Sequence, residues 1–304
     1  MTPHAVLKYW SRRLATLSLS LALAAAWPLS SALAADAAPA AAPAPAKADA
    51  ARPDALGKTE VLWLGQSATR ITTPGGRVIL IDPYLTQNPK TPPEYKNLDA
   101  LGHVDLILVT HAHFDHLGDG PEIAKRLKVP LIGPAGMNQS LIELGVLPPE
   151  LAPRMNKSGT IQPLGPGIRI TMVRAEHSSE LAWHNPATGK DETHVGGEPV
   201  GFVIELENGF KIYHMGDTGL FGDMKFIGDY YRPDLVLIPI GGHFTMGPQE
   251  AAYAVRYWLR PHYALPIHYG TYPVLKGTPE EFIKALGPSR TKVLDLKPGD
   301  AVTF

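Results

Sequence analysis

The sequence predicts an α/β (α+β) domain in which two mixed β-sheets pack together and are flanked by helices. Three observations indicate this architecture. Short apolar runs typical of strands outnumber the helical patterns, the runs come in clusters, and the helical patterns fall between the clusters. Several runs also end in a histidine or an aspartate, which favours a polar rim at one edge of the sheets.

The first half of the domain contains three apolar runs of strand length and two helical patterns. The helical patterns at 121–128 and 136–144 flank a short strand at 130–133. We expect the other strands at 60–65, 77–82 and 104–110, where the chain reads EVLWLG, RVILID and VDLILVT.

The second half repeats this general order of strands, polar turns and helices. We expect strands at 167–175, 199–206, 210–217, 234–240 and 263–268. A helix at 247–259 has Pro248 in its first turn, and its aromatics Tyr253, Tyr257 and Trp258 have the spacing of core residues. A second helix at 278–286 begins with a threonine cap and an acidic first turn.

Residues 1–34 have the layout of a secretory signal peptide. Lys8, Arg12 and Arg13 precede an apolar stretch at 14–26, and small residues then lead to an A-x-A cleavage site ending at Ala34. The apolar stretch is shorter than the roughly 20 residues that a membrane span needs. We therefore expect export to the periplasm, cleavage near Ala34 and no stable membrane span after cleavage. The choice between the general and the twin-arginine route stays open.

Composition divides the rest of the chain and excludes some functions. Residues 35–57 are rich in alanine and proline and should form an extended linker, so the folded domain is 58–304. Cleavage removes three basic residues and no acid, which changes the formal charge from −1 to −4. A mildly acidic chain without a basic stripe argues against nucleic-acid binding. The absence of cysteine excludes disulfides, thiolate zinc sites and a cysteine nucleophile.

The segment HAHFDH carries the clearest chemical signal. His111, His113, Asp115 and His116 directly follow an apolar strand. Residues i and i+2 at a strand end point the same way, so His111 and His113 can bind one ion. One ion rarely takes four ligands from six adjacent residues, and this crowding indicates a second ion for Asp115 and His116.

Three further polar residues end apolar strands elsewhere in the chain. His177 follows RITMVRAE, Asp217 follows KIYHMG and His268 follows ALPI. Each has an alternative structural explanation: His177 as a loop histidine, Asp217 as a turn cap and His268 as a buried histidine. Together with the HAHFDH cluster, they are candidate metal ligands at one rim of the sheets.

With these motifs in place, residues 58–304 resemble the metallo-β-lactamase superfamily of metal-dependent hydrolases. WLGQSATRI, LIDPYL, PIGGHFTMGP and PIHYGTYP are similar to the branch that includes ascorbate-6-phosphate lactonase-like and phospholipase D-like proteins. The resemblance implies an αββα sandwich of two mixed sheets with a metal site at one edge. It implies the following ligands: His111, His113 and His177 for one metal, Asp115, His116 and His268 for the other, and Asp217 bridging both.

The resemblance also assigns residues around the ligands. Asp82 in IDP matches an aspartate that orients a ligand imidazole. Gln66 in LGQS departs from the branch, which often has histidine there, so its role in substrate contact or proton transfer is open. Independently of the resemblance, His243 in GGHFTM follows an apolar strand and is the candidate general acid or substrate contact, with a rim histidine packed beneath the following helix as the alternative. Asp115, Asp217 and His243 are the predicted catalytic residues.

The expected cofactors are two divalent ions, zinc first, with manganese or iron as alternatives. A hydroxide shared by the two ions would attack a carbonyl or phosphoryl centre, and one ion would stabilise the developing charge. The substrate would be a lactone, ester, amide or phosphoester of a small molecule or lipid head group. The polar, glycine-rich segment 183–199, with His184 and His194, is expected to form a substrate-facing loop.

Other functions remain as alternatives. A non-catalytic metal-binding or scaffold protein could keep the same fold, but the ligand set is complete. A β-lactamase is disfavoured because true β-lactamases of this fold generally lack the bridging aspartate. A nuclease is disfavoured by the expected export and the negative charge. Neither the substrate nor the oligomeric state can be inferred from the sequence.

Overall fold

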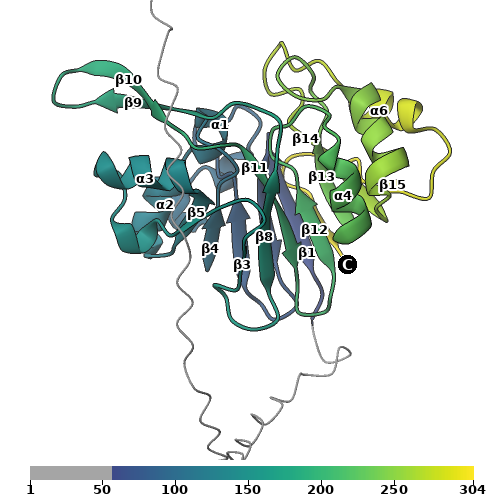
Figure 1. The fold of residues 1–304 in the computed structure, drawn as a ribbon, viewed down its shortest axis with the longest axis horizontal. Coiled ribbons are helices and arrows are strands. Elements are labelled where there is room, and N and C mark those ends of the chain that lie inside the picture. The colour runs from purple at the N-terminus through teal and green to yellow at the C-terminus, as the bar shows by residue number, and fades with distance from the viewer. Residues whose placement is uncertain (1–56) are drawn as a thin grey trace, which may run out of the picture. The chain divides into compact units, whose positions relative to one another are not determined.

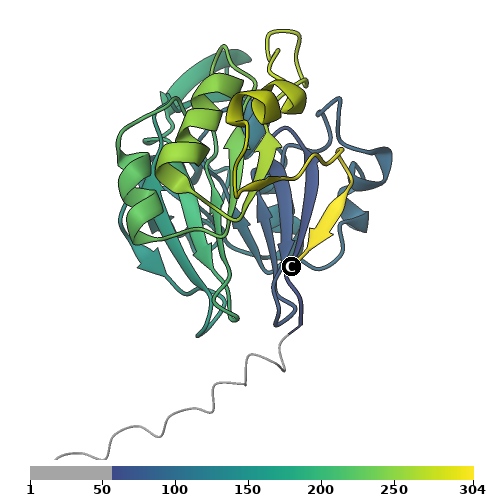
Figure 2. The same cartoon turned by 90° about the vertical axis from the view of Figure 1, so that its right-hand side faces the viewer.

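Two seven-stranded mixed sheets pack face to face in the computed structural model, which describes residues 57–304 (Figure 1, Figure 2). The predicted signal peptide 1–34 and all but the last residue of the predicted linker 35–57 lie outside the described residues. Within 57–304, none of the helices has both the length and the apolar character needed to cross a membrane.

The first sheet contains the N-terminal strands and one strand from the C-terminus. Its strands β3 and β4 run parallel, and so do β4 and β5, whereas β1, β2 and β3 form an antiparallel meander. In spatial order the strands are β16 (Ala301–Thr303), β1 (Glu60–Gly65), β2 (Ala68–Thr72), β3 (Val78–Ile81), β4 (Leu106–Leu108), β5 (Leu131–Pro134) and β6 (Arg154–Met155).

The second sheet contains seven further strands, and β12, β13 and β14 in it are parallel. In spatial order its strands are β15 (Lys292–Val293), β14 (Tyr263–Ile267), β13 (Leu235–Pro239), β12 (Lys211–His214), β11 (Val200–Glu205), β8 (Arg169–Arg174) and β7 (Thr160–Ile161).

Helices cover the outer faces of both sheets (Figure 2). The first sheet carries α2 (Gly120–Leu127) and α3 (Ala135–Glu143), and the short helix α1 (Phe114–Leu117) follows β4. The second sheet carries α4 (Asp223–Tyr230), α5 (Pro248–Tyr253) with its π-helical continuation η5 (Ala254–Leu259), and α6 (Pro279–Leu286). Single 3₁₀ turns lie at η2 (Pro93–Tyr95), η3 (Leu98–Ala100) and η4 (Pro149–Leu151).

The alternation of side chains explains why the strands are apolar throughout. In β1, Val61 and Trp63 face the second sheet, whereas Leu62 and Leu64 face the covering helices. A strand that is buried on both faces needs apolar residues at successive positions, since neighbouring side chains point to opposite faces. The predicted two-sheet fold flanked by helices is confirmed.

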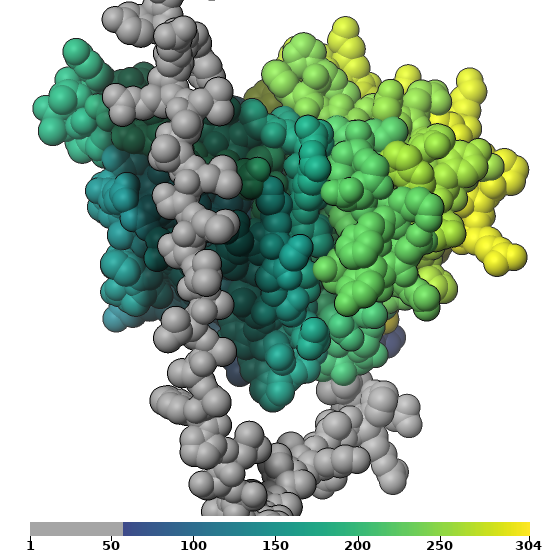
Figure 3. Space-filling model, viewed as in Figure 1, coloured from purple at the N-terminus to yellow at the C-terminus, as the bar shows by residue number. Residues whose placement is uncertain are grey.

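The segment 183–199 was expected to be a loop, and this prediction is wrong. β9 (Glu180–Asn185) and β10 (Lys190–Val195) pair antiparallel and form a separate two-stranded hairpin that projects from the body (Figure 1, Figure 3). One face of this ribbon is exposed and the other is half-buried, and its mostly polar sequence is not distinguished from a loop by single-sequence patterns.

Two aromatic residues on the helix predicted at 247–259 also lie differently from expectation. Tyr253 and Tyr257 are 45% and 55% exposed, so they are not core residues. The core contacts of this helix come from its small and aliphatic residues, such as Ala251 and Val255. Strand β2, with the sequence ATRIT, and helix α4 were not predicted because neither has a clear hydrophobic period.

Candidate metal centre

The seven candidate ligands follow strands that end at the same edge of the sandwich. Strand β4 precedes the HAHFDH turn, whereas β8, β12 and β14 precede His177, Asp217 and His268. Their side chains form two groups, and within each group one nitrogen or oxygen per residue lies within 4.8 Å of the others. The groups are His111, His113 and His177, called here the three-histidine group, and Asp115, His116, Asp217 and His268, called the mixed group.

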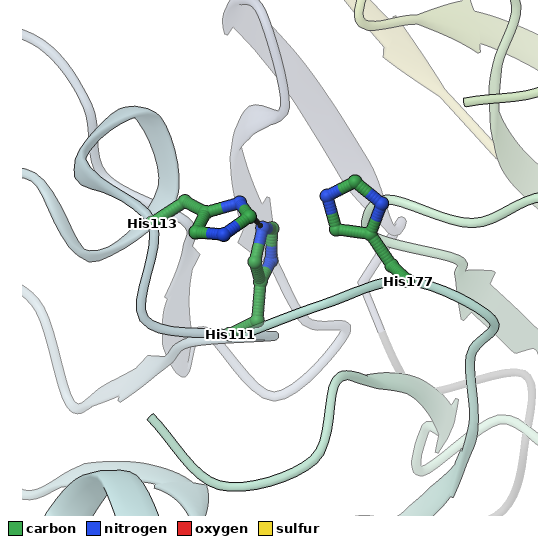
Figure 4. Close-up of side chains that lie close together, drawn as sticks. All are labelled: His111, His113 and His177. Carbon is green, nitrogen blue, oxygen red and sulfur yellow. Dashed lines mark hydrogen bonds between the residues drawn. The ribbon is translucent and has the colours of Figure 1, made fainter. Parts of the chain in front are cut away.

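The three-histidine group joins the turn after β4 to the turn after β8. His111 Nε2 lies 3.0 Å from His113 Nδ1, and the His177 ring is perpendicular to the His111 ring with centroids 5.1 Å apart (Figure 4). His111 is fully buried, whereas His113 and His177 are partly exposed. The group is therefore open to solvent on one side.

The mixed group is more deeply buried and is organised around Asp217. Asp217 Oδ1 lies 3.1 Å from His116 Nε2, and its Oδ2 lies 3.0 Å from His268 Nε2. The same Oδ2 is 3.6 Å from His177 Nε2, which belongs to the three-histidine group. Asp217 thus lies between the two groups.

A glycine allows Asp217 to reach this position. Gly216 has a φ of +60°, and a Cβ on it would lie 2.7–2.8 Å from the side-chain atoms of Thr110. Any other residue would push the turn after β12 away from the end of β4. The two sheets can therefore bring Asp217 beside the HAHFDH turn only because position 216 has no side chain.

Several atoms in the mixed group are buried without a hydrogen-bond partner among residues 57–304. They are His116 Nε2, Asp217 Oδ1 and both ring nitrogens of His268. Buried polar atoms are normally hydrogen-bonded, and unpaired ones need another partner. Imidazole nitrogens and carboxylate oxygens that converge without bonding one another match the donor set of a divalent cation.

Comparison with known proteins gives the family. The family model described as beta-lactamase superfamily domain matches residues 77–269. The chain is 66% identical over 250 residues to a UPF0173 metal-dependent hydrolase of Polaromonas, covering 82% of this chain and 91% of the relative. The chain belongs to the metallo-β-lactamase superfamily. The predicted family is confirmed, and the chain is a metal-dependent hydrolase.

Solved structures agree with this family. Igni18, a metallo hydrolase from the archaeon Ignicoccus hospitalis, is 33% identical with a TM-score of 0.69, covering 81% of this chain and 98% of that chain. The metallo-β-lactamase fold protein YhfI from Bacillus subtilis is 13% identical with a TM-score of 0.57, covering 82% and 100%. The second likeness concerns the fold alone.

In this superfamily member, Asp82 holds His116 in one orientation. Asp82 is fully buried, and its Oδ2 lies 2.8 Å from His116 Nδ1. Thr110 donates to both carboxylate oxygens of Asp82, through its backbone N–H and its hydroxyl, at 2.8 Å each. A carboxylate at Nδ1 requires a proton there, so the neutral, metal-binding form of His116 has its lone pair on Nε2, which faces the mixed group.

Glu180, at the start of β9, was not among the predicted site residues. Its Oε2 lies 3.0 Å from His113 Nε2, so His113 presents Nδ1 to the three-histidine group. The neighbouring Ser179 accepts from the Ala112 N–H at 3.1 Å and donates to the Gly196 carbonyl at 2.8 Å. The base of the hairpin is therefore tied to the HAHFDH turn. The sequence signal that could have identified Glu180 is its position, an acidic residue three residues after the candidate ligand His177.

Charges in the mixed group stabilise one another. Burial alone would lower the pKa of His268, but Asp217 and Asp115 outweigh it and raise the pKa to about 9. Burial would raise the pKa of Asp115, but the charge of His116 leads the opposing effects and lowers the pKa to about 2. In His111, burial and the neighbouring His116 both lower the pKa well below its usual value. The protein thus contains a compact array of opposite charges.

The structure does not bring the other predicted residues into either group. His243 is exposed on the turn before α5, with a φ of +61°, and its ring packs on Phe244. No contact between His243 and the seven candidate ligands supports its predicted role as general acid. His184 and His194 pair with Asp191 and Glu192 within the hairpin, at 2.8 and 3.1 Å.

Proposed function

We propose that this hydrolase binds two divalent ions, one at each group, and cleaves a lactone, ester, amide or phosphoester bond. The position of Asp217 carries the proposal, since its carboxylate is within 3.0–3.6 Å of ligand nitrogens from both groups. A carboxylate placed in this way would suit two neighbouring ions, as in dinuclear hydrolases.

Each residue has a defined part in this proposal. His111, His113 and His177 hold one ion, Asp115, His116 and His268 hold the other, and Asp217 binds both. When bound, the ions supply water activation and polarise the substrate oxygen. Zinc is the proposed metal because imidazole and carboxylate ligands suit it, and manganese and iron accept the same donors.

A small substrate is supported by the space beside the three-histidine group. A hollow of about 240 Å³ is lined by the apolar residues Ala112 and Phe114, which flank His113 in the chain, and by polar residues such as Thr86, Gln87 and Asp119. Phe114 is 64% exposed although it lies between two candidate ligands. A hollow of this size with a mixed polar and apolar lining suits a small molecule or a lipid head group, and the acidic chain disfavours nucleic acid.

We also propose that the protein is exported to the periplasm after cleavage near Ala34. The basic, apolar and small-residue order of residues 1–34 supports this location. Cell fractionation and the mass of the mature N-terminus test it. A cytoplasmic protein that keeps its first residues would contradict it.

Metal content and one substitution test the two-ion site. Purified protein should contain close to two ions per chain, and Asp217→Ala should lose turnover and part of its metal. Elemental analysis combined with a chelator-sensitive assay measures both quantities. A wild-type rate in Asp217→Ala would remove this residue from the site, and one ion per chain would rule out the two-ion form.

A substrate panel tests the reaction class. It contains p-nitrophenyl phosphodiesters, lactones and the β-lactam nitrocefin, each assayed with and without chelator. We expect turnover of a lactone or phosphodiester. Turnover of nitrocefin alone would favour a β-lactamase instead.

A further inference from the structure

We infer that Gln66 is a positioning residue that holds two members of the mixed group, Asp115 and His268, in place for the metal. This inference rests on the proposed function, because it assumes that the mixed group binds an ion. It concerns the one position at which the LGQS motif departs from the branch pattern.

Gln66 makes three hydrogen bonds from a fully buried position in the turn between β1 and β2. Its side-chain Nε2 donates to Asp115 Oδ2 at 2.9 Å. Its backbone carbonyl accepts from the His268 N–H at 3.0 Å and from Trp63 Nε1 at 3.0 Å. A single residue of the first sheet therefore contacts two candidate ligands from different parts of the chain.

The amide contact determines how Asp115 is oriented. The oxygen that accepts from Gln66 is also the one 3.5 Å from His268 Nε2. A carboxylate accepts only, so the Gln66 amide must present its N–H₂ side to Asp115. The bond limits rotation of the carboxylate about its last torsion and keeps it facing the mixed group, as partners of ligand carboxylates do.

The chemistry of glutamine makes this contact insensitive to pH. A histidine at this position could lose or gain a proton, or could bind a metal itself. A glutamine amide does neither, so its N–H₂ group remains a hydrogen-bond donor at any pH. We expect Gln66 to act on the geometry of Asp115 without taking part in proton transfer.

The backbone at Gln66 supports a functional reason for its placement. Within 57–304, eight non-glycine residues have a positive φ, and three of them, Gln66, Asp82 and His268, lie at the mixed group. Such conformations are disfavoured for side chains other than glycine and concentrate at functional sites. The left-handed turn at Gln66 directs its carbonyl toward the His268 N–H while its side chain reaches Asp115.

Side-chain variants separate this role from a purely structural one. Gln66→Leu keeps the bulk and the backbone contacts but removes the donor. Gln66→Glu places a second carboxylate opposite Asp115. Gln66→His supplies an N–H with similar reach and should rescue the contact. The control is Ser67→Ala, since Ser67 is equally buried and its hydroxyl has no hydrogen-bond partner among the described residues.

The experiment measures Zn²⁺ affinity of each full-length variant by chelator competition, and follows Co²⁺ binding by its visible absorption spectrum. Gln66→Leu should lower the affinity for the ion of the mixed group about 10–100-fold, which is the usual effect of losing such a partner. The affinity for the ion of the three-histidine group should stay unchanged. Gln66→Glu should also lower the affinity for the ion of the mixed group, Gln66→His should recover most of it, and Ser67→Ala should match the wild type. Melting temperatures of the metal-free proteins show whether each variant folds.

The outcomes distinguish this inference from the proposed function. The number of ions bound by the wild type tests the two-ion site, and no Gln66 variant is needed for that result. Whether the wild type binds one ion or two, a folded Gln66→Leu that holds every ion as tightly as the wild type overturns the inference. Equal weakening of both ions, or failure of Gln66→His to recover affinity, also overturns it by assigning Gln66 a general structural role.

Discussion

Replacing Asp82 by asparagine tests how the orientation of one imidazole controls the metal site. Asparagine keeps the size of Asp82 and tolerates its φ of +48°. Its oxygen can still accept from the Thr110 N–H, and its amide can donate to the Thr110 hydroxyl. It cannot accept from His116 Nδ1 at the same time, because its nitrogen is a donor only.

The magnitude follows from the lost contact. One buried hydrogen bond to a charged group disappears, which costs about 1.5–3 kcal/mol of unfolding free energy in the metal-free protein. His116 can recover a bond only by accepting at Nδ1, and its Nε2 then carries the proton and cannot bind an ion. Metal affinity should therefore fall about 10–100-fold, which corresponds to about 1.4–2.8 kcal/mol of binding free energy.

Three measurements on Asp82→Asn check this reasoning. Urea unfolding of the chelated protein gives the stability change, chelator competition gives the metal affinity, and ¹⁵N NMR of the imidazole gives the tautomer. Asp105→Asn is the matched control, since Asp105 is also largely buried and caps the Val78 N–H at 2.8 Å, outside both groups. Wild-type metal affinity in Asp82→Asn, with the protein folded, would refute the reasoning.

Two further predictions concern the outer contacts and the charge array. Glu180→Gln should lower the affinity for the ion of the three-histidine group by no more than about fivefold. Glu180 is exposed, and such a contact to His113 contributes at most about 1 kcal/mol. A loss of affinity larger than in Asp82→Asn, measured by the same chelator competition, would contradict this ranking. The raised pKa of His268, about 9, stabilises the metal-free protein below pH 6.5 and loses this effect as the pH rises toward 9, by roughly 3 kcal/mol. Metal affinity should rise over the same range because ligand histidines must lose their protons, and a flat stability profile from urea unfolding at several pH values would count against the charge array.

The positions of the seven candidate ligands could be predicted because the end of each strand is visible in the sequence as the end of an apolar run. An apolar run that stops at His177, Asp217 or His268 places that residue at a sheet edge, and parallel strands bring such edges together. The crowding of ligands within HAHFDH indicated a second ion, and the resemblance to the superfamily implied how the seven residues divide into two groups. These features depend on local periodicity and on strand direction, which are visible in one sequence.

Other features depend on contacts between distant segments and were missed for that reason. The partnership of Glu180 with His113 needs the hairpin to stand at the HAHFDH turn, and no local pattern fixes that approach. The link from Gln66 to Asp115 crosses 49 positions of the chain. His243 looked equivalent to the ligands because it also follows an apolar strand, but it is exposed on the turn before α5 and contacts Phe244 instead.

The candidate ligands come from both layers of the sandwich, in a chain that has no cysteine to join them covalently. Cations bound at this edge would therefore cross-link the two sheets, and Asp217 would be a ligand common to both cations. Stripping the cations should loosen the rim first and leave the opposite end of the sandwich intact. Amide hydrogen exchange should then accelerate at the rim turns that carry the ligands, well before the interior strands β3 and β13 open.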